Sequence, residues 1–272
     1  MTYTIEKVTT LIGARRYGDN DTNIGFILTD SRSLCFPEET LFFALKSERN
    51  DGHNYIPELY RRGVKNFVVR NVPKAYSSEY PVAHLLKVVI TIEALQRLAE
   101  RHRDEFNIPI VGITGSNGKT MVKEWLYQLL SPSMFVTRSP RSYNSQIGVP
   151  LSVWLMNEQT QVGVFEAGIS MPGEMLALRD IIQPTIAVLT NLGAAHQENF
   201  SSLEEKCREK LILFHDAETV IYDGDDEVIN KVIAEYPDYK GEKLFWSLKN
   251  PEAPFYVKNI EKQQSVSVIT YI

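Results

Sequence analysis

The stretch Gly112–Thr120, which reads GITGSNGKT, constrains the fold more than any other feature of the sequence. An apolar run with strand character, residues 108–114, leads into it, and residues 121–130 follow with the periodicity of a helix. The helical stripe is expected to consist of Val122, Trp125, Leu126 and Leu129. A strand, a glycine-rich turn and a helix in this order predict a loop that binds phosphate, although Gly112 comes one residue earlier than in the usual spacing.

The residues of this turn offer the chemistry that a nucleotide phosphate requires. Gly115 and Gly118 permit a close approach of the backbone, and the helix that follows begins with free N–H groups that attract an anion. We expect Lys119 to reach the outer phosphates and the Thr120 hydroxyl to bind Mg²⁺. A glycine-rich turn with a surface lysine is the weaker interpretation, because strand, Gly-Lys-Thr and helix occur in the right order.

Strand-like and helix-like segments alternate through the second part of the chain. The predicted strands lie at 162–168, 185–193 and 219–226, and the predicted helices at 173–182 and 202–214. Such alternation indicates a mainly parallel sheet with helices on both faces. The first part has shorter strand-like runs, one small strand–helix–strand pattern and an amphipathic helix at 91–106. We therefore predict an α/β protein with two domains, residues 1–104 and 105–272.

The composition is that of a soluble globular protein, with 43% hydrophobic and 23% charged residues among 272. A net charge of -5 argues against binding nucleic acid through bulk charge, and no apolar run suggests insertion into a membrane. Two cysteines without metal-binding spacing, Cys35 and Cys207, and the lack of a signal peptide at the start favour the cytoplasm. The run 265–272 reads as a strand without a cap, so we expect the sequence to be part of a longer chain.

The ends of the predicted parallel strands are where ligands bind in such sheets. Glu166 follows the apolar run of the strand predicted at 162–168, and a carboxylate there suits the Mg²⁺ that bridges phosphates. A solvent-facing glutamate is the better interpretation of Glu166 taken alone. His196 follows the next strand, and a lone loop histidine is more often a solvated or packing residue than a ligand.

Lys210 lies on the apolar side of the predicted helix at 202–214, which opens with Ser202 and Glu205 in capping-box spacing. The periodicity favours an amine that extends from the edge of the stripe to solvent. The alternative is burial, which would lower the pKa of Lys210 and leave a neutral amine. Such an amine can react with carbon dioxide to give an anionic carbamate that binds a metal.

Several segments together resemble the Mur ligase family. Residues 112–120 resemble the ATP loop that these ligases share with folylpolyglutamate synthases, and 191–214 resembles the segment from their metal-binding histidine to their carbamylated lysine. The blocks 29–46 and 51–56 resemble the UDP-sugar-binding domain of Mur ligases. Residues 142–154 and 165–175 are similar to the branch that adds D-alanyl-D-alanine.

The resemblance implies ATP-dependent amide formation, in which the carboxylate of a UDP-N-acetylmuramoyl tripeptide becomes an acyl phosphate and D-alanyl-D-alanine attacks it. The expected phosphate ligands are Thr114, Gly115, Ser116, Asn117, Gly118, Lys119 and Thr120. Thr120 and Glu166 would bind one Mg²⁺, and His196 with carbamylated Lys210 would bind a second. The expected substrate contacts are Asn144 for the muramoyl peptide and Ser31 and Arg32 for the UDP group. Simple turn roles remain alternatives for all three substrate contacts.

The resemblance also has gaps and competitors. Mur ligases have a third domain that these residues do not supply, so we expect the 272 residues alone to lack full ligase activity. Asp223 replaces an asparagine of the family and leaves a nucleotide role there open. The segments 31–46 and 193–200 resemble a branch fused to an alanine racemase. The competing interpretations are a folylpolyglutamate synthase-like ligase, a P-loop regulator that binds ATP without ligation, and a partner-binding fragment.

Overall fold

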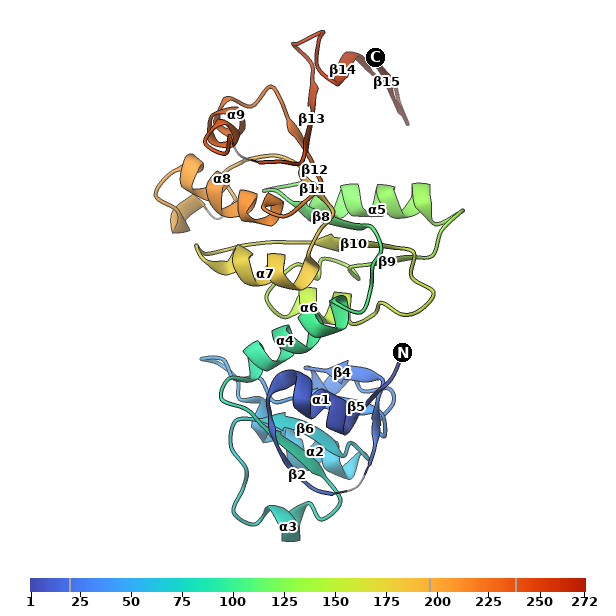
Figure 1. Ribbon diagram of the computed structural model, residues 1–272, viewed down its shortest axis with the longest axis vertical. Coiled ribbons are helices and arrows are strands. Elements are labelled where there is room, and N and C mark those ends of the chain that lie inside the picture. Colours follow the sequence, from blue (N-terminus) through green and yellow to red (C-terminus); the bar gives the residue numbers. More distant parts are fainter. Residues whose placement is uncertain (20, 196, 238) are drawn as a thin grey trace. The chain divides into compact units, whose positions relative to one another are not determined.

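Short apolar segments bounded by turn residues form the strands of two larger sheets (Figure 1). The computed structural model describes residues 1–19, 21–195, 197–237 and 239–272. These residues form two compact units, Met1–Glu105 and Phe106–Ile272. Each unit has its own sheet and its own core.

The first unit is built on a five-stranded sheet in the order β2-β7-β6-β5-β4. Strands β4, β5, β6 and β7 are parallel to one another, and β2 runs antiparallel to β7 at the edge. The strand bounds are β2 Arg15–Tyr17, β4 Phe26–Leu28, β5 Thr40–Phe43, β6 Asn66–Val69 and β7 His84–Lys87. A separate antiparallel pair joins β1 Tyr3–Thr4 to β3 Asn23–Ile24.

Four α-helices and two short 3-10 helices complete the described part of the first unit. Their bounds are α1 Ile5–Ile12, η1 Ser31–Ser33, η2 Gly52–Tyr55, α2 Ile56–Arg61, α3 Tyr76–Glu79 and α4 Thr91–Arg103. One face of the sheet packs on α2 through a core that includes Phe42, Leu59 and Phe67. Helix α1 packs against α4, where the Tyr3 hydroxyl and His102 Nδ1 lie 2.8 Å apart.

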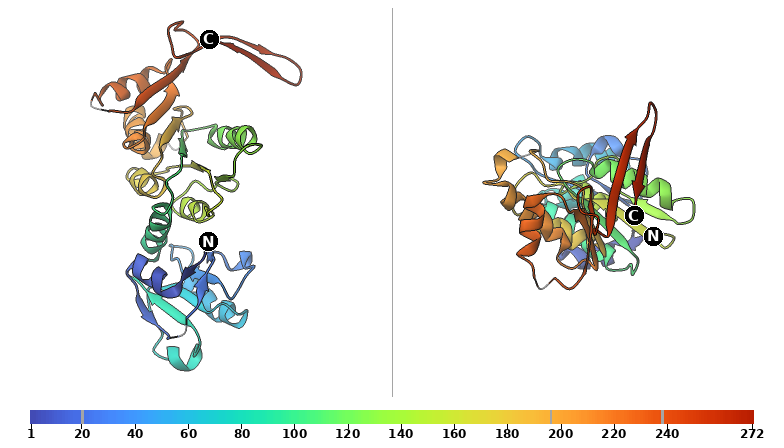
Figure 2. Two further views of the ribbon diagram at one scale, coloured as in Figure 1. Left: turned by 45° about the vertical axis from the view of Figure 1, so that its right-hand side comes forward. Right: turned by 90° about the horizontal axis from the view of Figure 1, so that it is seen from above.

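The second unit contains an eight-stranded sheet in the order β15-β14-β13-β12-β11-β8-β10-β9. All neighbouring strands are parallel except β14 and β15, which form an antiparallel pair that extends from the edge (Figure 2). The bounds are β8 Ile110–Thr114, β9 Val136–Arg138, β10 Val162–Glu166, β11 Ile186–Leu189, β12 Thr219–Asp223, β13 Glu242–Ser247, β14 Phe255–Lys262 and β15 Ser267–Tyr271. The sheet is therefore mainly parallel, as the alternation of segments predicts.

Helices lie on both faces of this sheet, which confirms the predicted fold class. Their bounds are α5 Lys119–Leu130, α6 Gly148–Val153, α7 Glu174–Ile182, η3 Gln197–Asn199, α8 Leu203–Leu211, η4 Ile212–Phe214 and α9 Glu227–Ala234. Helix α5 lies on the opposite side of the strands from α7 and α8 (Figure 1), while α6, α7, η4, α8 and α9 contact one another in series. None of the helices in the described residues is both long enough and apolar enough to span a bilayer.

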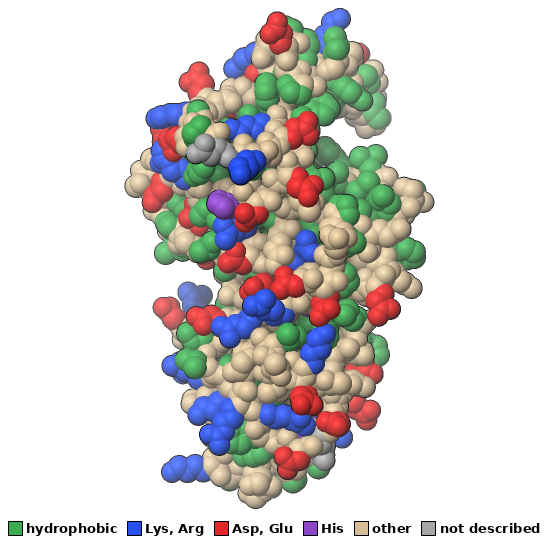
Figure 3. Space-filling model, viewed as in Figure 1, with side chains coloured by type: hydrophobic (Ala, Val, Ile, Leu, Met, Phe, Trp, Pro, Cys, Tyr) green, Lys and Arg blue, Asp and Glu red, His purple; other side chains and the backbone are tan. Residues whose placement is uncertain are grey.

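The predicted apolar stripe of α5 is partly wrong. Val122 and Leu126 do pack on the sheet, together with Leu130, but Trp125 is 57% exposed and Leu129 is 75% exposed. Hydrophobic side chains accordingly gather on the surface over α5 (Figure 3). The helix has two adjacent apolar lines, and periodicity alone does not tell which of them faces the strands.

Candidate active site at the carboxyl ends of the parallel strands

The glycine-rich loop follows the last residue of β8 and leads directly into α5. Its backbone requires glycine at two positions, because φ is +142° at Gly115 and +82° at Gly118. At Gly115 the need is also steric, since a Cβ placed there would lie 1.9 Å from the Thr190 hydroxyl oxygen. The sequence pattern therefore corresponds to a loop whose path excludes a side chain at Gly115.

The segment after β11 holds the loop from the neighbouring strand end. The Thr190 hydroxyl donates to the carbonyl of Asn117 at 2.5 Å, and Asn191 accepts the Asn117 N–H at 2.8 Å. Ser116 and Gly193 exchange two hydrogen bonds, at 3.1 Å and 2.9 Å. These contacts fix the loop before any ligand arrives, which reduces the ordering cost of binding.

The start of α5 presents hydrogen-bond donors and a cation. The N-cap residue of α5 is Gly118, which has no side chain that could cap the helix, whereas the Ser202 and Asp226 side chains cap α8 and α9. The first N–H groups of α5 are thus available to an anion. Lys119 folds back and donates to the Gly115 carbonyl at 2.7 Å. Burial lowers the pKa of Lys119, and the nearby Glu166 carboxylate acts in the opposite direction.

Glu166 lies beside the loop, as its position at the end of β10 suggests. Strand β10 is the neighbour of β8, with Glu166 in register with Ile113. The Thr120 hydroxyl donates to Glu166 Oε2 at 3.0 Å. The solvent-facing interpretation of Glu166 is wrong, because its side chain is fully buried. Two hard oxygen donors therefore meet at the start of α5, which is the ligand chemistry that Mg²⁺ prefers.

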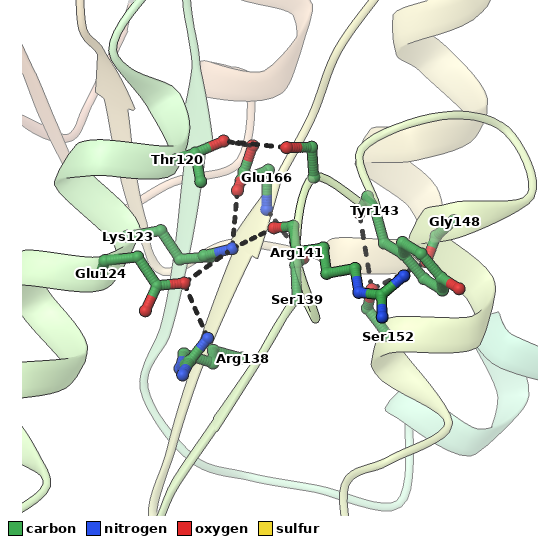
Figure 4. A network of polar contacts seen from close by, with 11 residues as sticks. Thr120, Lys123, Glu124, Arg138, Ser139, Arg141, Tyr143, Gly148, Ser152 and Glu166 are labelled. Carbon is green, nitrogen blue, oxygen red and sulfur yellow. Dashed lines mark hydrogen bonds and ion pairs between the residues drawn. The ribbon is translucent and has the colours of Figure 1, made fainter.

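A buried lysine that the sequence reasoning missed completes this part of the site (Figure 4). The Lys123 ammonium lies 2.9 Å from Glu166 Oε1 and 3.1 Å from Glu124 Oε1. It also donates a hydrogen bond to the carbonyl of Arg141. The only available signal was its position four residues after Lys119 on the same helix, which is too common to carry a prediction.

Two further lysines are buried on α8. Lys210 is 2% exposed, so the interpretation that its amine extends to solvent is wrong. Burial, together with the positive charges of Lys119 and Lys206, lowers the pKa of Lys210 to about 7. Lys206 is also buried but donates to the carbonyls of Gly193 and Ala195, each at 2.5 Å. Within the described residues the Lys210 amine has no such partner.

The remaining residues of the predicted metal and substrate sites differ in what can be said of them. His196 lies outside the described residues. Asn144 is half-buried. Its backbone carbonyl accepts the Gly168 N–H at 2.8 Å, which places it next to the end of β10. A Cβ at Gly168 would lie 2.9 Å from the Asn144 amide carbon, so the glycine makes room for that side chain.

In the first unit, Ser31 and Arg32 form the 3-10 helix after β4. Asp30 caps this helix and binds the exposed Arg32 guanidinium, with a shortest distance of 2.6 Å. The hydrogen bonds from Arg32 lower the pKa of Asp30 to about 2. The Ser31 carbonyl accepts from Arg62 at 2.9 Å. The turn is thus held by Asp30 and by Arg62, and it presents a cation at the surface.

The acids at 223–226 have structural roles in the turn after β12. Asp226 caps α9 by accepting two backbone N–H groups, and Asp225 accepts from the Ser247 hydroxyl at 2.5 Å. Asp223 accepts the Asp225 N–H at 2.9 Å, and burial raises the pKa of Asp223. These contacts give each of the three acids a role in holding the turn, and none of these roles requires a nucleotide.

Comparisons with known proteins show the family to which the chain belongs. The pattern of the Mur ligase middle domain matches residues 113–272, more than half of the chain. The chain belongs to the Mur ligase family. The matched region begins in β8 and includes the loop, Glu166 and Lys210. The resemblance seen in the sequence is therefore confirmed at the level of the family.

Individual Mur ligases extend the likeness. The chain is 34% identical over 213 residues to the UDP-N-acetylmuramoyl-tripeptide–D-alanyl-D-alanine ligase of Bacillus subtilis (strain 168), covering 76% of this chain and 45% of that protein. MurF from Acinetobacter baumannii has a similar fold, with a TM-score of 0.89 at 24% identity over 100% of this chain and 58% of that one. MurF ligase from Thermotoga maritima, in complex with ADP, matches with a TM-score of 0.77 at 27% identity, covering 90% and 55%. The chain thus spans about half the length of these relatives.

Proposed function

We propose that the chain provides the UDP-sugar-binding part, residues 1–104, and the ATP-binding part, residues 105–272, of a ligase that adds D-alanyl-D-alanine to UDP-N-acetylmuramoyl tripeptide. The reaction forms an amide through an acyl phosphate and belongs to the cytoplasmic synthesis of peptidoglycan precursors, hence to cell-wall growth, cell shape and division. The observation that carries the proposal is the pairing of Thr120 with Glu166 beside a phosphate loop, in a chain similar to such ligases.

The ATP phosphates would bind the loop and the start of α5. The uncapped N–H groups at the start of α5 suit phosphate oxygens. Lys119, whose ammonium already lies over the loop at the Gly115 carbonyl, would turn to the outer phosphates. The Thermotoga maritima relative was solved with ADP, which supports a nucleotide in the corresponding fold.

The residues present also fit Mg²⁺. Thr120 and Glu166 supply two oxygen donors 3.0 Å apart, and the described residues contain no cluster of three or more histidine, cysteine or acidic side chains suited to a metal. Mg²⁺ commonly keeps waters and takes few protein ligands together with substrate phosphates. When bound, the ion would neutralise phosphate oxygens that otherwise repel the incoming groups.

Lys210 fits the role of a carbamylated ligand for a second Mg²⁺. Its amine nitrogen would form a bond to the carbon of CO₂ and release one proton to solvent, which leaves an anionic carbamate. A neutral amine is required for that step, and burial favours the neutral form because it lowers the pKa of Lys210 to about 7. His196 is proposed as the other protein ligand of this ion.

The substrate contacts are proposed from position and chemistry. Arg32 presents a guanidinium at the surface of the first unit, which suits the diphosphate of a UDP group together with Ser31. Asn144 lies beside the end of β10, near the residues that bind the metal, and suits the muramoyl peptide. D-alanyl-D-alanine would enter as the amine. The proposal does not extend to a fused racemase, for which the described residues carry no chemistry.

Two other functions remain to be separated by experiment. A folylpolyglutamate synthase-like ligase would share the loop and the buried lysine, but it leaves the 29–46 block of the first unit without a role. A P-loop regulator that binds ATP without ligation leaves the buried Lys210 unexplained. The D-alanyl-D-alanine ligase accounts for both features.

The test uses the complete natural polypeptide that carries this sequence. It is mixed with ATP, Mg²⁺, UDP-N-acetylmuramoyl tripeptide and D-alanyl-D-alanine, and phosphate release is measured with each component omitted in turn. We expect release to require both the tripeptide and the dipeptide. Release that is independent of the dipeptide would overturn the proposal, and release with a folate and glutamate instead would favour the competing ligase.

A further inference from the structure

The Lys123 ammonium is the point where three separate segments of the second unit meet (Figure 4). It comes from α5, binds the Glu166 carboxylate at the end of β10, and donates to the carbonyl of Arg141 in the loop 139–144. Lys123 and Glu166 are both 0% exposed. A lysine buried to this extent beside a carboxylate is unusual, because removing both charges from water is costly.

The loop that Lys123 contacts is attached to the metal-binding residues at several points. Ser139 accepts the Glu166 N–H through its hydroxyl at 3.1 Å, and the Ser142 hydroxyl lies 3.4 Å from that of Thr120. Arg141 has a left-handed backbone, with φ of +49°, which a residue with a side chain rarely adopts. The hydrogen bond from Lys123 to the Arg141 carbonyl therefore supports a backbone that is unfavourable on its own.

We propose that Lys123 is a positioning residue that holds Glu166 in the orientation of a Mg²⁺ ligand and fixes the loop 139–144 beside it. The ammonium takes Oε1, so that Oε2 is directed to the Thr120 hydroxyl. This inference rests on the proposed function, because it assumes that Mg²⁺ and nucleotide bind at Thr120 and Glu166. It goes beyond that function because it gives a positioning role to Lys123, which acts on the metal site through Glu166.

Two opposite effects of Lys123 on Mg²⁺ must be weighed. Its charge repels a cation and reduces the attraction of Glu166 for the metal. On the other hand, a fully buried carboxylate that loses its counterion would leave the position in which it contacts Thr120. Since Glu166 has no exposed surface, the second effect is the larger one, and Lys123 keeps the carboxylate in place as a ligand.

The test measures the dissociation constant of ADP for the complete polypeptide, with Mg²⁺ and with EDTA, by calorimetry. The ratio of the two constants reports the metal contribution, whereas a general loosening of the fold would weaken both equally. We expect Lys123→Met to reduce this ratio by at least about tenfold, the usual effect of losing a residue that orients a metal ligand. Lys123→Gln, which can still donate but carries no charge, should reduce it less and is expected to fold if Lys123→Met does not.

Glu124→Gln is the matched control, because it removes the other carboxylate near the same ammonium, 3.1 Å away. We expect Glu124→Gln to leave the ratio within about twofold of the wild type. In a second experiment, we expect that Lys123→Met causes no further loss in a protein that already carries Glu166→Gln. An unchanged or increased ratio in Lys123→Met and Lys123→Gln, or an equal loss in Glu124→Gln, would overturn the inference alone. A wild type whose ADP binding ignores Mg²⁺ would overturn the proposed metal site and the inference with it.

Discussion

Replacing Gly115 by alanine should damage nucleotide binding through two separate physical effects. The first is backbone strain, because φ of +142° at this position is rarely adopted by a residue with a side chain. The second is a collision, since the new Cβ would lie 1.9 Å from the Thr190 hydroxyl oxygen. That hydroxyl must move, and it then loses its hydrogen bonds to the carbonyls of Asn117 and Thr114.

The magnitude of the Gly115→Ala effect follows from these parts. A residue forced into such a backbone region costs about 1–3 kcal/mol, and each lost hydrogen bond about 1 kcal/mol. Partial relaxation of the loop would recover some of this, so we take about 3 kcal/mol for holding the loop in its binding conformation. Because about 1.4 kcal/mol corresponds to a factor of ten, the affinity for MgADP should fall roughly a hundredfold.

The assay is calorimetric titration of MgADP, with Gly173→Ala as the control for backbone strain. Gly173 also has a positive φ, of +86°, but a Cβ there would meet no atom of the described residues within 4 Å. It lies outside the loop, so its substitution should lower stability slightly and leave the affinity unchanged. The collision itself is tested by adding Thr190→Ala, which removes the hydroxyl and should make the Gly115→Ala penalty smaller than in the wild-type background.

Two results would contradict this reasoning. If Gly115→Ala binds MgADP within about threefold of the wild type, the loop does not need the observed backbone for binding. If the Gly115→Ala penalty is the same with and without the Thr190 hydroxyl, the collision is not the cause, and strain alone must account for the loss.

Three further predictions concern α8. Ser202→Ala removes the helix cap, in which the Ser202 hydroxyl accepts the Glu205 N–H at 3.1 Å, and should lower the unfolding free energy by about 1 kcal/mol in urea denaturation; an unchanged midpoint would contradict the cap. Lys206→Met removes the donor to two loop carbonyls and should lower the unfolding free energy by about 2 kcal/mol in the same measurement. A gain in stability would instead mean that the cost of burying the Lys206 charge exceeds the benefit of its hydrogen bonds. Burial lowers the pKa of Lys210 from 10.5 to about 7. At a pH between these two values, Lys210 therefore carries a proton in the unfolded chain and has lost it in the folded chain. Stability should therefore rise with pH across this range, by about 2 kcal/mol from pH 7 to pH 9 relative to Lys210→Met in buffer free of metal and bicarbonate; a difference that does not change with pH would refute the buried amine.

The sequence predicts the parts of this site that depend on local order. Strand, glycine-rich turn and helix follow one another within residues 108–130, and the structure has β8, the loop and α5 in these places. The rule that parallel strands end at one edge also predicts correctly that Glu166 lies near the loop, because β10 is adjacent to β8. These predictions require only which segments are strands, not how side chains pack.

The parts that were missed depend on contacts between distant segments. Lys123 pairs with Glu166, which is 43 residues away in sequence, and no periodicity in α5 indicates such a partner. The same limitation explains the error in the stripe of α5, where Trp125 and Leu129 belong to the outer of two apolar lines. For Lys210 the helical pattern correctly predicts a position on the apolar side of α8 but favours an exposed amine. The error arises because a helical pattern does not show how deeply an apolar stripe is buried.

Four lysines of the described residues lie in or near this site, and they are accommodated in three different ways in the low-dielectric surroundings. Lys123 has a buried carboxylate as its counterion, and Lys206 and Lys119 donate to backbone carbonyls. Lys210 has none of these partners among the described residues, and two of the other lysines lower its pKa further. The two carbonyls stabilise the protonated form of Lys206, so Lys206 is a poorer candidate for carbamylation than Lys210, although burial lowers the pKa of Lys206 as well. Lys210 is the lysine for which losing the proton relieves both burial and repulsion, and an anionic carbamate there would reverse the charge that its neighbours oppose.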